Sequence, residues 1–285
     1  MRLLGPRPRQ GAAATGCCHC RRPRDQGARK AVEGPLDTPA VFARRDGFLF
    51  HWHDQNAALV KGMDADLVCG HGRPDGPRRV AVETRNDGRV VVFAQHAVAV
   101  CTGSGAALPD LPGIAELRPW ISLDATSAST VPERLAIVGG GGVGTEMASA
   151  YQGLGASVTL LVRGEGLLPR MEPFVEQLVA RALAKAGVDV RMCVTVTALS
   201  RSEGTGPVTL LLDDGTELEA DEVRFANGRT PLTDDIGLET VGLTPGSWLE
   251  VDETCRVRAI NDGWLYAMGD VNYHALLRAV LRTRS

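Results

Sequence analysis

The sequence lacks the features that mark several common classes of protein. Its 285 residues contain no apolar run long enough to cross a bilayer, so we expect no membrane-spanning helix. The formal net charge of −3 gives no reason to expect a nucleic acid as partner. The seven cysteines have no regular spacing, which argues against a disulfide framework. We expect four of them, scattered among apolar positions, to be reduced core cysteines of a cytoplasmic protein: Cys69, Cys101, Cys193 and Cys255.

The first 27 residues differ in composition from the remainder of the chain. They contain six arginines and a single acid, Asp25, and proline and glycine interrupt them. Because no apolar periodicity emerges, we expect disorder over residues 1–27. A transit peptide is the alternative, although the stretch has no serine and its prolines disfavour an amphipathic helix. Cys17-x-x-Cys20 has no second ligand pair at suitable spacing, so we expect exposed thiols there and no metal site.

The most informative stretch follows Arg134. A short apolar run, Leu135–Val138, predicts a buried strand, and Gly139-x-Gly141-x-x-Gly144 comes directly after it at the start of a helical pattern. Strand, glycine turn and helix in this order are the context of a dinucleotide-binding fingerprint. A second strand follows at the distance that such a unit requires, over Ala156–Val162. The first glycine permits the tight turn, the second lets a pyrophosphate approach the backbone, and the third lets the helix pack closely.

Further elements can be predicted around this unit. Gly187 ends a helix over Glu172–Ala186. Asn86-Asp87-Gly88 predicts a hairpin of strands Arg79–Thr84 and Arg89–Phe93. A small antiparallel meander with a turn at Asp214-Gly215 is expected over Val194–Leu199, Val208–Asp213 and Glu217–Glu219. Other strands are expected at Asp66–Cys69, His96–Cys101 (closed by Thr102–Gly105), Val188–Met192, Glu222–Ala226, Trp248–Val251 and Trp264–Ala267. Helical segments are expected at Val41–Arg45, Ala57–Gly62 and Ala275–Thr283, and a proline-marked linker at Pro109–Pro119.

Four pieces of the chain follow one another in a telling order: Val100-Cys101-Thr102-Gly103-Ser104, then Gly139–Glu146, then Ala226-Asn227-Gly228-Arg229-Thr230-Pro231, then Gly269-Asp270. In this order they together resemble motifs of the class I pyridine nucleotide–disulfide oxidoreductases. This family includes dihydrolipoamide dehydrogenase, mercuric reductase and glutathione reductase. Asn227 replaces the usual threonine of the third piece. The resemblance extends from about Ala40 to the end of the sequence.

The resemblance implies an α/β fold in which a three-layer Rossmann-like NAD(P)-binding domain is inserted in a partial FAD-binding domain. We place the partial FAD-binding domain at residues 28–116, the NAD(P)-binding domain at 117–244 and the return segment of the first domain at 245–285. The implied activity is hydride transfer from NAD(P)H to FAD and on to a disulfide or other acceptor. The implied nicotinamide-nucleotide residues are Gly139, Gly141, Gly142, Gly144, Glu146, Arg163 and Gly228, and the implied FAD residues are Thr102, Gly103, Gly269 and Asp270.

Three of these assignments have alternatives at the level of single residues. Val162 and Arg163 stand where an NAD site usually has an acid, so Arg163 favours the 2′-phosphate of NADP, unless it is a surface arginine on a loop. Arg170 could assist if the loop folds back. Glu146 contacts the nicotinamide half or merely complements the helix dipole. Asp270 binds sugar hydroxyls or is a turn aspartate.

Three parts of the family pattern have no counterpart in this sequence. They are the first glycine turn for the FAD pyrophosphate, the Cys-x4-Cys redox pair and the C-terminal interface domain with its His–Glu pair. We therefore assign no catalytic residue, expect weak or absent FAD binding and impaired activity, and regard the family's homodimer as doubtful here. A damaged gene or a misplaced start is one explanation. The alternative function is a catalytically inactive NAD(P)-binding module.

Overall fold

The computed structural model describes residues 36–49, 60, 62–63, 65–84, 88–201 and 206–274. The expected disorder of residues 1–27, the Cys17-x-x-Cys20 pair, the Asn86-Asp87 turn, most of the 57–62 helix and the 275–283 helix lie outside the described residues. The chain divides into two compact units. Unit 1 contains the described residues among 54–105 and 229–274, and unit 2 contains those among 36–49 and 106–228.

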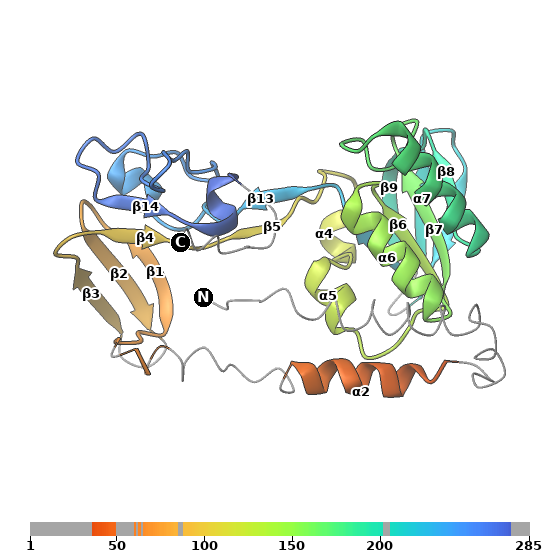
Figure 1. Cartoon of the computed structure of the whole chain (residues 1–285), viewed down its shortest axis with the longest axis horizontal. Helices are drawn as coiled ribbons and strands as arrows, with labels where there is room; N and C mark the ends of the chain where they lie inside the picture. The colour runs from red at the N-terminus through yellow and green to blue at the C-terminus, as the bar shows by residue number, and fades with distance from the viewer. Residues whose placement is uncertain are drawn as a thin grey trace. The chain divides into compact units, whose positions relative to one another are not determined.

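A four-stranded sheet of parallel strands forms the centre of unit 2. Its order is β12-β6-β7-β8, and its strands are β6 (Arg134–Val138), β7 (Ser157–Val162), β8 (Asp189–Met192) and β12 (Glu222–Phe225). Helix α6 (Gly142–Gly153) connects β6 to β7, and α7 (Pro173–Lys185) connects β7 to β8. Both helices cover one face of the sheet (Figure 1). The expected strands and helices of this region are confirmed.

The alternation of side chains along the strands produces three layers in unit 2. Leu135 and Ile137 of β6 point to α6, whereas Ala136 between them points to the opposite face. That opposite face is covered by an antiparallel sheet of order β11-β10-β9, whose strands are β9 (Val196–Arg201), β10 (Val208–Leu212) and β11 (Glu217–Ala220). The predicted meander and the three-layer α/β architecture are therefore confirmed.

Polar contacts hold the central strand and its helix in place. The guanidinium of Arg134 donates to Asp221 Oδ1 at 2.7 Å, and the Arg134 backbone N–H donates to Asp221 Oδ2 at 2.8 Å. These bonds lower the pKa of the Asp221 carboxyl. On the helix side, the hydroxyl of Tyr151 donates to Ala125 O at 2.7 Å, and burial raises the pKa of Tyr151 to about 12. Both contacts join segments distant in sequence.

The segment expected to be a proline-marked linker contains one short helix, and a second short helix follows it. These are α4 (Ile114–Leu117) and α5 (Ser122–Ser127). They form because Leu117 packs into the core beneath the antiparallel sheet and Ala125 packs into the core beneath α6. The linker prediction is therefore wrong for Ile114–Leu117, whereas residues 109–113 form neither helix nor strand.

Helix α2 (Thr38–Phe48) also belongs to unit 2. It is longer than the Val41–Arg45 segment that the sequence suggests. Asp37 accepts a hydrogen bond from the Ala40 N–H at 3.0 Å and caps its N-terminus. Val41 and Phe42 pack against Leu154, which follows α6.

Unit 1 contains a three-stranded antiparallel sheet of order β1-β2-β3 (Figure 1). Its strands are β1 (Gly70–Pro74), β2 (Arg79–Thr84) and β3 (Arg89–Phe93). The hairpin of β2 and β3 is confirmed, but the strand expected at Asp66–Cys69 is wrong, since the strand begins at Gly70. The reason is the register: Gly70 lies opposite Thr84, the last residue of β2, so among the described residues the register of this sheet ends at Gly70.

Two short strand pairs complete unit 1. β4 (Val98–Val100) pairs in parallel with β14 (Leu265–Ala267), and β5 (Ser104–Ala106) pairs with β13 (Arg229–Pro231). The expectation that Ser104 and Gly105 merely close the preceding strand is thus wrong, because they form a strand of their own. Two short 3-10 helices follow, η4 (Leu238–Val241) and η5 (Gly269–Asn272).

The core of unit 1 explains a further difference from the sequence-based expectations. Val100, Leu238, Leu249, Val251 and Trp264 share one buried cluster. Val251 makes only an isolated bridge with Val257, so the expected strand at Trp248–Val251 is wrong. Leu249 and Val251 of this segment are buried in the core, but among the described residues the segment does not pair with a neighbouring strand in a sheet. Residues 229–243 contribute to this core through Ile236, Leu238, Val241 and Leu243, and the chain passes from one compact unit to the other at 105/106 and at 228/229. The bounds of the two nucleotide-binding domains at 116 and 244 stay a prediction.

The described cysteines differ from the expectation of core positions. All four are free, as expected, but Cys69 and Cys193 are exposed and Cys101 and Cys255 are half-buried. Burial raises the pKa of the Cys101 thiol. Within the described residues, no helix is long and apolar enough to cross a membrane, and no group of histidine, cysteine and acidic side chains could hold a metal ion.

Candidate nucleotide-binding site

The glycine turn after β6 is built from positions that exclude side chains. Gly139 has a φ of 121°, and a Cβ there would lie 2.7 Å from Ala226 O. A Cβ on Gly144 would collide with Gly139 O, so a side chain at either position would force the turn apart. A Cβ on Gly140 would lie 2.7 Å from Val162. These glycines allow α6 to begin immediately beside the end of β6.

The other two glycines of the turn face open space. A Cβ on Gly141 or on Gly142 would meet nothing within 4 Å. Gly141 is the N-cap of α6, and no side chain caps it. The first N–H groups of a helix have no acceptor within the helix, and the helix dipole adds positive potential there. This arrangement fits the pyrophosphate of a dinucleotide, which needs close approach to bare amides.

The loop after β7 folds back onto the glycine turn. The Leu168 N–H donates to Gly140 O at 2.8 Å, and Leu167 is fully buried beneath it. Arg163 directly follows β7 and is exposed, and Arg170 is exposed on the same loop. The loop therefore keeps both guanidinium groups on a segment that is attached to the turn. The sequence indicated the two arginines but not this attachment, because Leu167 and Leu168 resemble ordinary apolar loop residues.

The end of β12 lies next to the same turn. The Ala226 N–H donates to Val138 O at 2.7 Å, and a Cβ on Gly139 would lie 2.9 Å from Asn227 Oδ1. Gly228 is exposed, with a φ of 126° and open space around it. The residues assigned to the nicotinamide nucleotide thus gather at the carboxyl edge of the parallel sheet. Glu146 is exposed in the second turn of α6, which leaves both of its alternative roles open.

In unit 1, the parallel pairing of β4 with β14 brings together the four residues assigned to FAD. The Met268 N–H donates to Val100 O at 3.0 Å, so Thr102 and Gly103 follow one strand beside Gly269 and Asp270, which follow the other. Both glycines have positive φ and open space around them. Thr102 Oγ1 is buried and has no hydrogen-bond partner among the described residues. An unsatisfied hydroxyl beside open glycine backbone fits a polar ligand here.

Two residues that the sequence did not assign to the site, Ser104 and Arg229, contact Asp270. The Ser104 hydroxyl donates to Asp270 Oδ2 at 3.0 Å, and Arg229 Nη2 lies 3.3 Å from the same oxygen. Arg229 also donates from Nε to Ser104 Oγ at 2.5 Å and from Nη2 to Ser104 O at 2.6 Å. Both residues stand inside the motifs that carried the resemblance, which is the signal that could have identified them.

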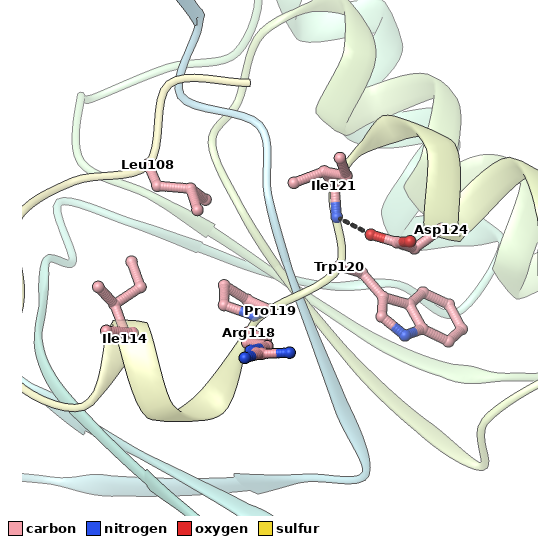
Figure 2. A pocket seen from close by; sticks show the side chains of 8 residues that line it. Leu108, Ile114, Arg118, Pro119, Trp120, Ile121 and Asp124 are labelled. Carbon is pink, nitrogen blue, oxygen red and sulfur yellow. Dashed lines mark hydrogen bonds between the residues drawn. The ribbon is translucent and has the colours of Figure 1, made fainter. Parts of the chain in front are cut away.

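A shallow hollow of unit 2 lies apart from the glycine turn. Figure 2 shows its side chains around the end of α4 and the start of α5, where the Ile121 N–H donates to Asp124 at 2.8 Å. Its walls are mostly apolar, and none of the sequence-predicted site residues lines it: Leu108, Ile114, Ala115, Arg118, Pro119, Trp120, Ile121 and Asp124. It adds nothing to the candidate site.

Comparison with known proteins identifies the family. The signature of the pyridine nucleotide-disulphide oxidoreductases matches residues 73–283, which include both groups of residues described above. The chain belongs to this family. Members of the family are oxidoreductases that use FAD and NAD(P)H. The resemblance seen in the sequence is confirmed.

Curated members of the family are similar along most of this chain. Dihydrolipoyl dehydrogenase 1, mitochondrial, of Arabidopsis thaliana is 32% identical over 247 residues, which are 83% of this chain and 47% of that protein. Mercuric reductase of Shigella flexneri is 32% identical over 76% of this chain and 38% of its own length. Glutathione reductase of Burkholderia cepacia is 30% identical over 81% of this chain and 49% of its own length. The chain thus spans about half or less of the length of these relatives.

Solved structures of the family share the fold. The HOCl-induced flavoprotein disulfide reductase RclA of Escherichia coli gives a TM-score of 0.78 at 22% identity, covering 95% of this chain and 57% of that one. LpdA of Mycobacterium tuberculosis gives 0.76 at 23% identity, covering 95% and 59%. At this identity the likeness concerns the fold alone.

Proposed function

We propose that this chain carries the nucleotide sites of an FAD-dependent NAD(P)H oxidoreductase. In such an enzyme a hydride passes from NAD(P)H, which is oxidised, to FAD, which is reduced, and the electrons then go to a disulfide or another acceptor. The observation that supports this most is the uncapped start of α6 after the glycine turn, in a chain that belongs to a family of such oxidoreductases.

Each group of residues has a proposed task. The amides after Gly141 hold the pyrophosphate of the nicotinamide nucleotide, with Gly139 and Gly144 shaping the turn and Gly142 leaving room for the ligand. Gly228 borders this site, and Glu146 approaches the nicotinamide half. In unit 1, the Asp270 carboxylate accepts hydrogen bonds from hydroxyl groups of FAD, and Thr102 supplies a hydroxyl beside Gly103 and Gly269.

The visible spectrum of the purified protein tests the proposal. A yellow protein whose flavin absorbance disappears on addition of NAD(P)H would support the oxidoreductase. A colourless protein that still binds NADPH would support the alternative, a catalytically inactive NAD(P)-binding module. Binding of neither nucleotide would contradict both functions.

We further propose that NADPH is preferred to NADH. Arg163 is exposed at the end of β7, where an acid would select the 2′-hydroxyl of NADH, and its loop is attached to the glycine turn. The Arg163→Glu variant should bind NADPH at least about tenfold more weakly, because a charge-assisted hydrogen bond becomes a repulsion. Arg181 is exposed on α7, so Arg181→Glu is the matched control and should leave NADPH binding unchanged. Tighter binding of NADH than of NADPH by the unaltered protein would refute the preference.

Location and assembly are proposed at the level of the family. A cytoplasmic location stays a proposal, since one of the relatives is named as a mitochondrial protein. A homodimer is typical of the family, and whether this chain forms one is a question for analytical ultracentrifugation.

A further inference from the structure

Three segments of unit 1 meet at the carboxylate of Asp270. Asp270 lies in η5, directly after β14, whereas Ser104 begins β5 and Arg229 begins β13. The two strands β5 and β13 are the stretches through which the chain leaves and re-enters this unit. Ser104 is thereby connected to residues that are 125 and 166 positions further along the chain.

The hydrogen bonds have one consistent direction. Arg229 can only donate, and it donates from Nε to Ser104 Oγ at 2.5 Å. The single hydroxyl hydrogen of Ser104 is then directed to Asp270 Oδ2 at 3.0 Å. Arg229 Nη2 lies 3.3 Å from that same oxygen. Both contacts use Oδ2, so within the described part of the chain Oδ1 keeps its lone pairs for another donor.

The shape of the guanidinium is what makes this arrangement specific. One side of Arg229 contacts Ser104 at both its hydroxyl and its carbonyl, while Nη2 also faces Asp270. A lysine ammonium at this position would keep the charge but could not span these atoms in one plane. Because the Arg229 and Asp270 side chains are 34% and 32% exposed, the ion pair alone would contribute little to stability. A role in orienting the carboxylate explains the geometry better.

We propose that Arg229, acting with Ser104, is a positioning residue that holds the Asp270 carboxylate for the sugar-alcohol hydroxyl groups of FAD. This inference rests on the proposed function, which assigns Asp270 to FAD. Arg229 fixes one carboxylate oxygen and leaves the other as the acceptor for the ligand. Arg229 itself is not a catalytic residue, because its contacts are to Ser104 and Asp270.

A double-mutant cycle on FAD affinity tests the inference. The dissociation constant is measured from the quenching of FAD fluorescence by the flavin-free full chain. Arg229→Lys should raise it about tenfold, the effect of losing one hydrogen bond to a charged group. In an Asp270→Ala background, Arg229→Lys should raise it no further, since the carboxylate to be positioned is gone. Ser104→Ala is the second variant and should show the same dependence on Asp270.

Controls separate positioning from general stability. Arg258→Lys removes an arginine of the same unit that donates to Val251 O at 2.9 Å, and it should leave FAD affinity unchanged. Thermal melts without FAD establish that each variant is folded. Equal weakening by Arg229→Lys with and without Asp270 would overturn the inference while leaving the proposed function standing. No FAD binding by the unaltered protein would overturn the flavin half of the proposed function, and the inference with it.

Discussion

At the scale of single residues, the candidate site depends on where a side chain cannot fit. Gly144 illustrates this, because a Cβ there would collide with the backbone oxygen of Gly139 in the preceding turn. Gly153 lies in the same helix, yet a Cβ there would meet nothing within 4 Å. Of these two glycines in one helix, only Gly144 must lack a side chain for the turn to form, whereas Gly153 has room for one.

This contrast predicts opposite outcomes for two alanine substitutions. Gly144→Ala should lower the free energy of unfolding by about 1–3 kcal/mol, the usual cost of overpacking, and weaken NADPH binding at least about tenfold. Gly153→Ala should leave NADPH binding unchanged and should stabilise the protein by up to about 1 kcal/mol. Urea unfolding and NADPH titration measure the two quantities. Normal NADPH affinity in Gly144→Ala would contradict the role given to the turn.

At the scale of elements, α2 contributes to unit 2 although β6, the first strand of the central sheet, begins far along the chain from it. Phe42 is 6% exposed and packs in a cluster with Val41 and Leu154, whereas Phe48 in the last turn is 59% exposed. Arg45 is buried beside Phe42 and donates to Ala128 O at 2.7 Å. The helix therefore covers apolar surface of unit 2 with one face only.

The two phenylalanines of α2 provide a matched pair for measurement. Phe42→Ala should lower the free energy of unfolding of unit 2 by about 3 kcal/mol, since a buried aromatic side chain is removed. Phe48→Ala should change it by less than about 0.5 kcal/mol, because its ring is largely in solvent. Denaturant unfolding followed by circular dichroism measures both. Similar effects of the two substitutions would show that α2 is not packed through Phe42.

At the scale of the whole molecule, the described residues form two units with separate cores. Trp264 and Leu265 belong to the core of unit 1, whereas Leu135 and Leu160 belong to that of unit 2. Two cores of this kind can unfold in separate steps. The residues that we propose for the nicotinamide nucleotide are all in unit 2, and those that we propose for FAD are all in unit 1.

NADPH should therefore stabilise one unit selectively. At a concentration of 100 times its dissociation constant, a ligand raises the free energy of unfolding of the unit that binds it by about 2.7 kcal/mol. Hydrogen exchange should become slower over residues 134–162, in β6, α6 and β7, and should be unchanged over residues 249–271. Equal protection of both segments would show that the molecule unfolds as one cooperative body.

The local patterns of the sequence determined much of this protein. The apolar run of β6, the glycine spacing after it and Gly187 after α7 are patterns within a few residues. From them the parallel strands and their helices were predicted correctly. The roles of the glycines and of Arg163 toward a nucleotide stay predictions.

Only the tertiary structure decided the features that depend on distant partners. β1 begins at Gly70 because β2 ends opposite it, and α5 forms because Ala125 has a core to enter. Asp270 meets Arg229 and Ser104 because β4 and β14 pair in parallel and β5 pairs with β13. The contact of Ser104 with Asp270, for example, joins side chains 166 residues apart. The free energy of such contacts depends on how the whole chain is arranged, which no short stretch of sequence encodes.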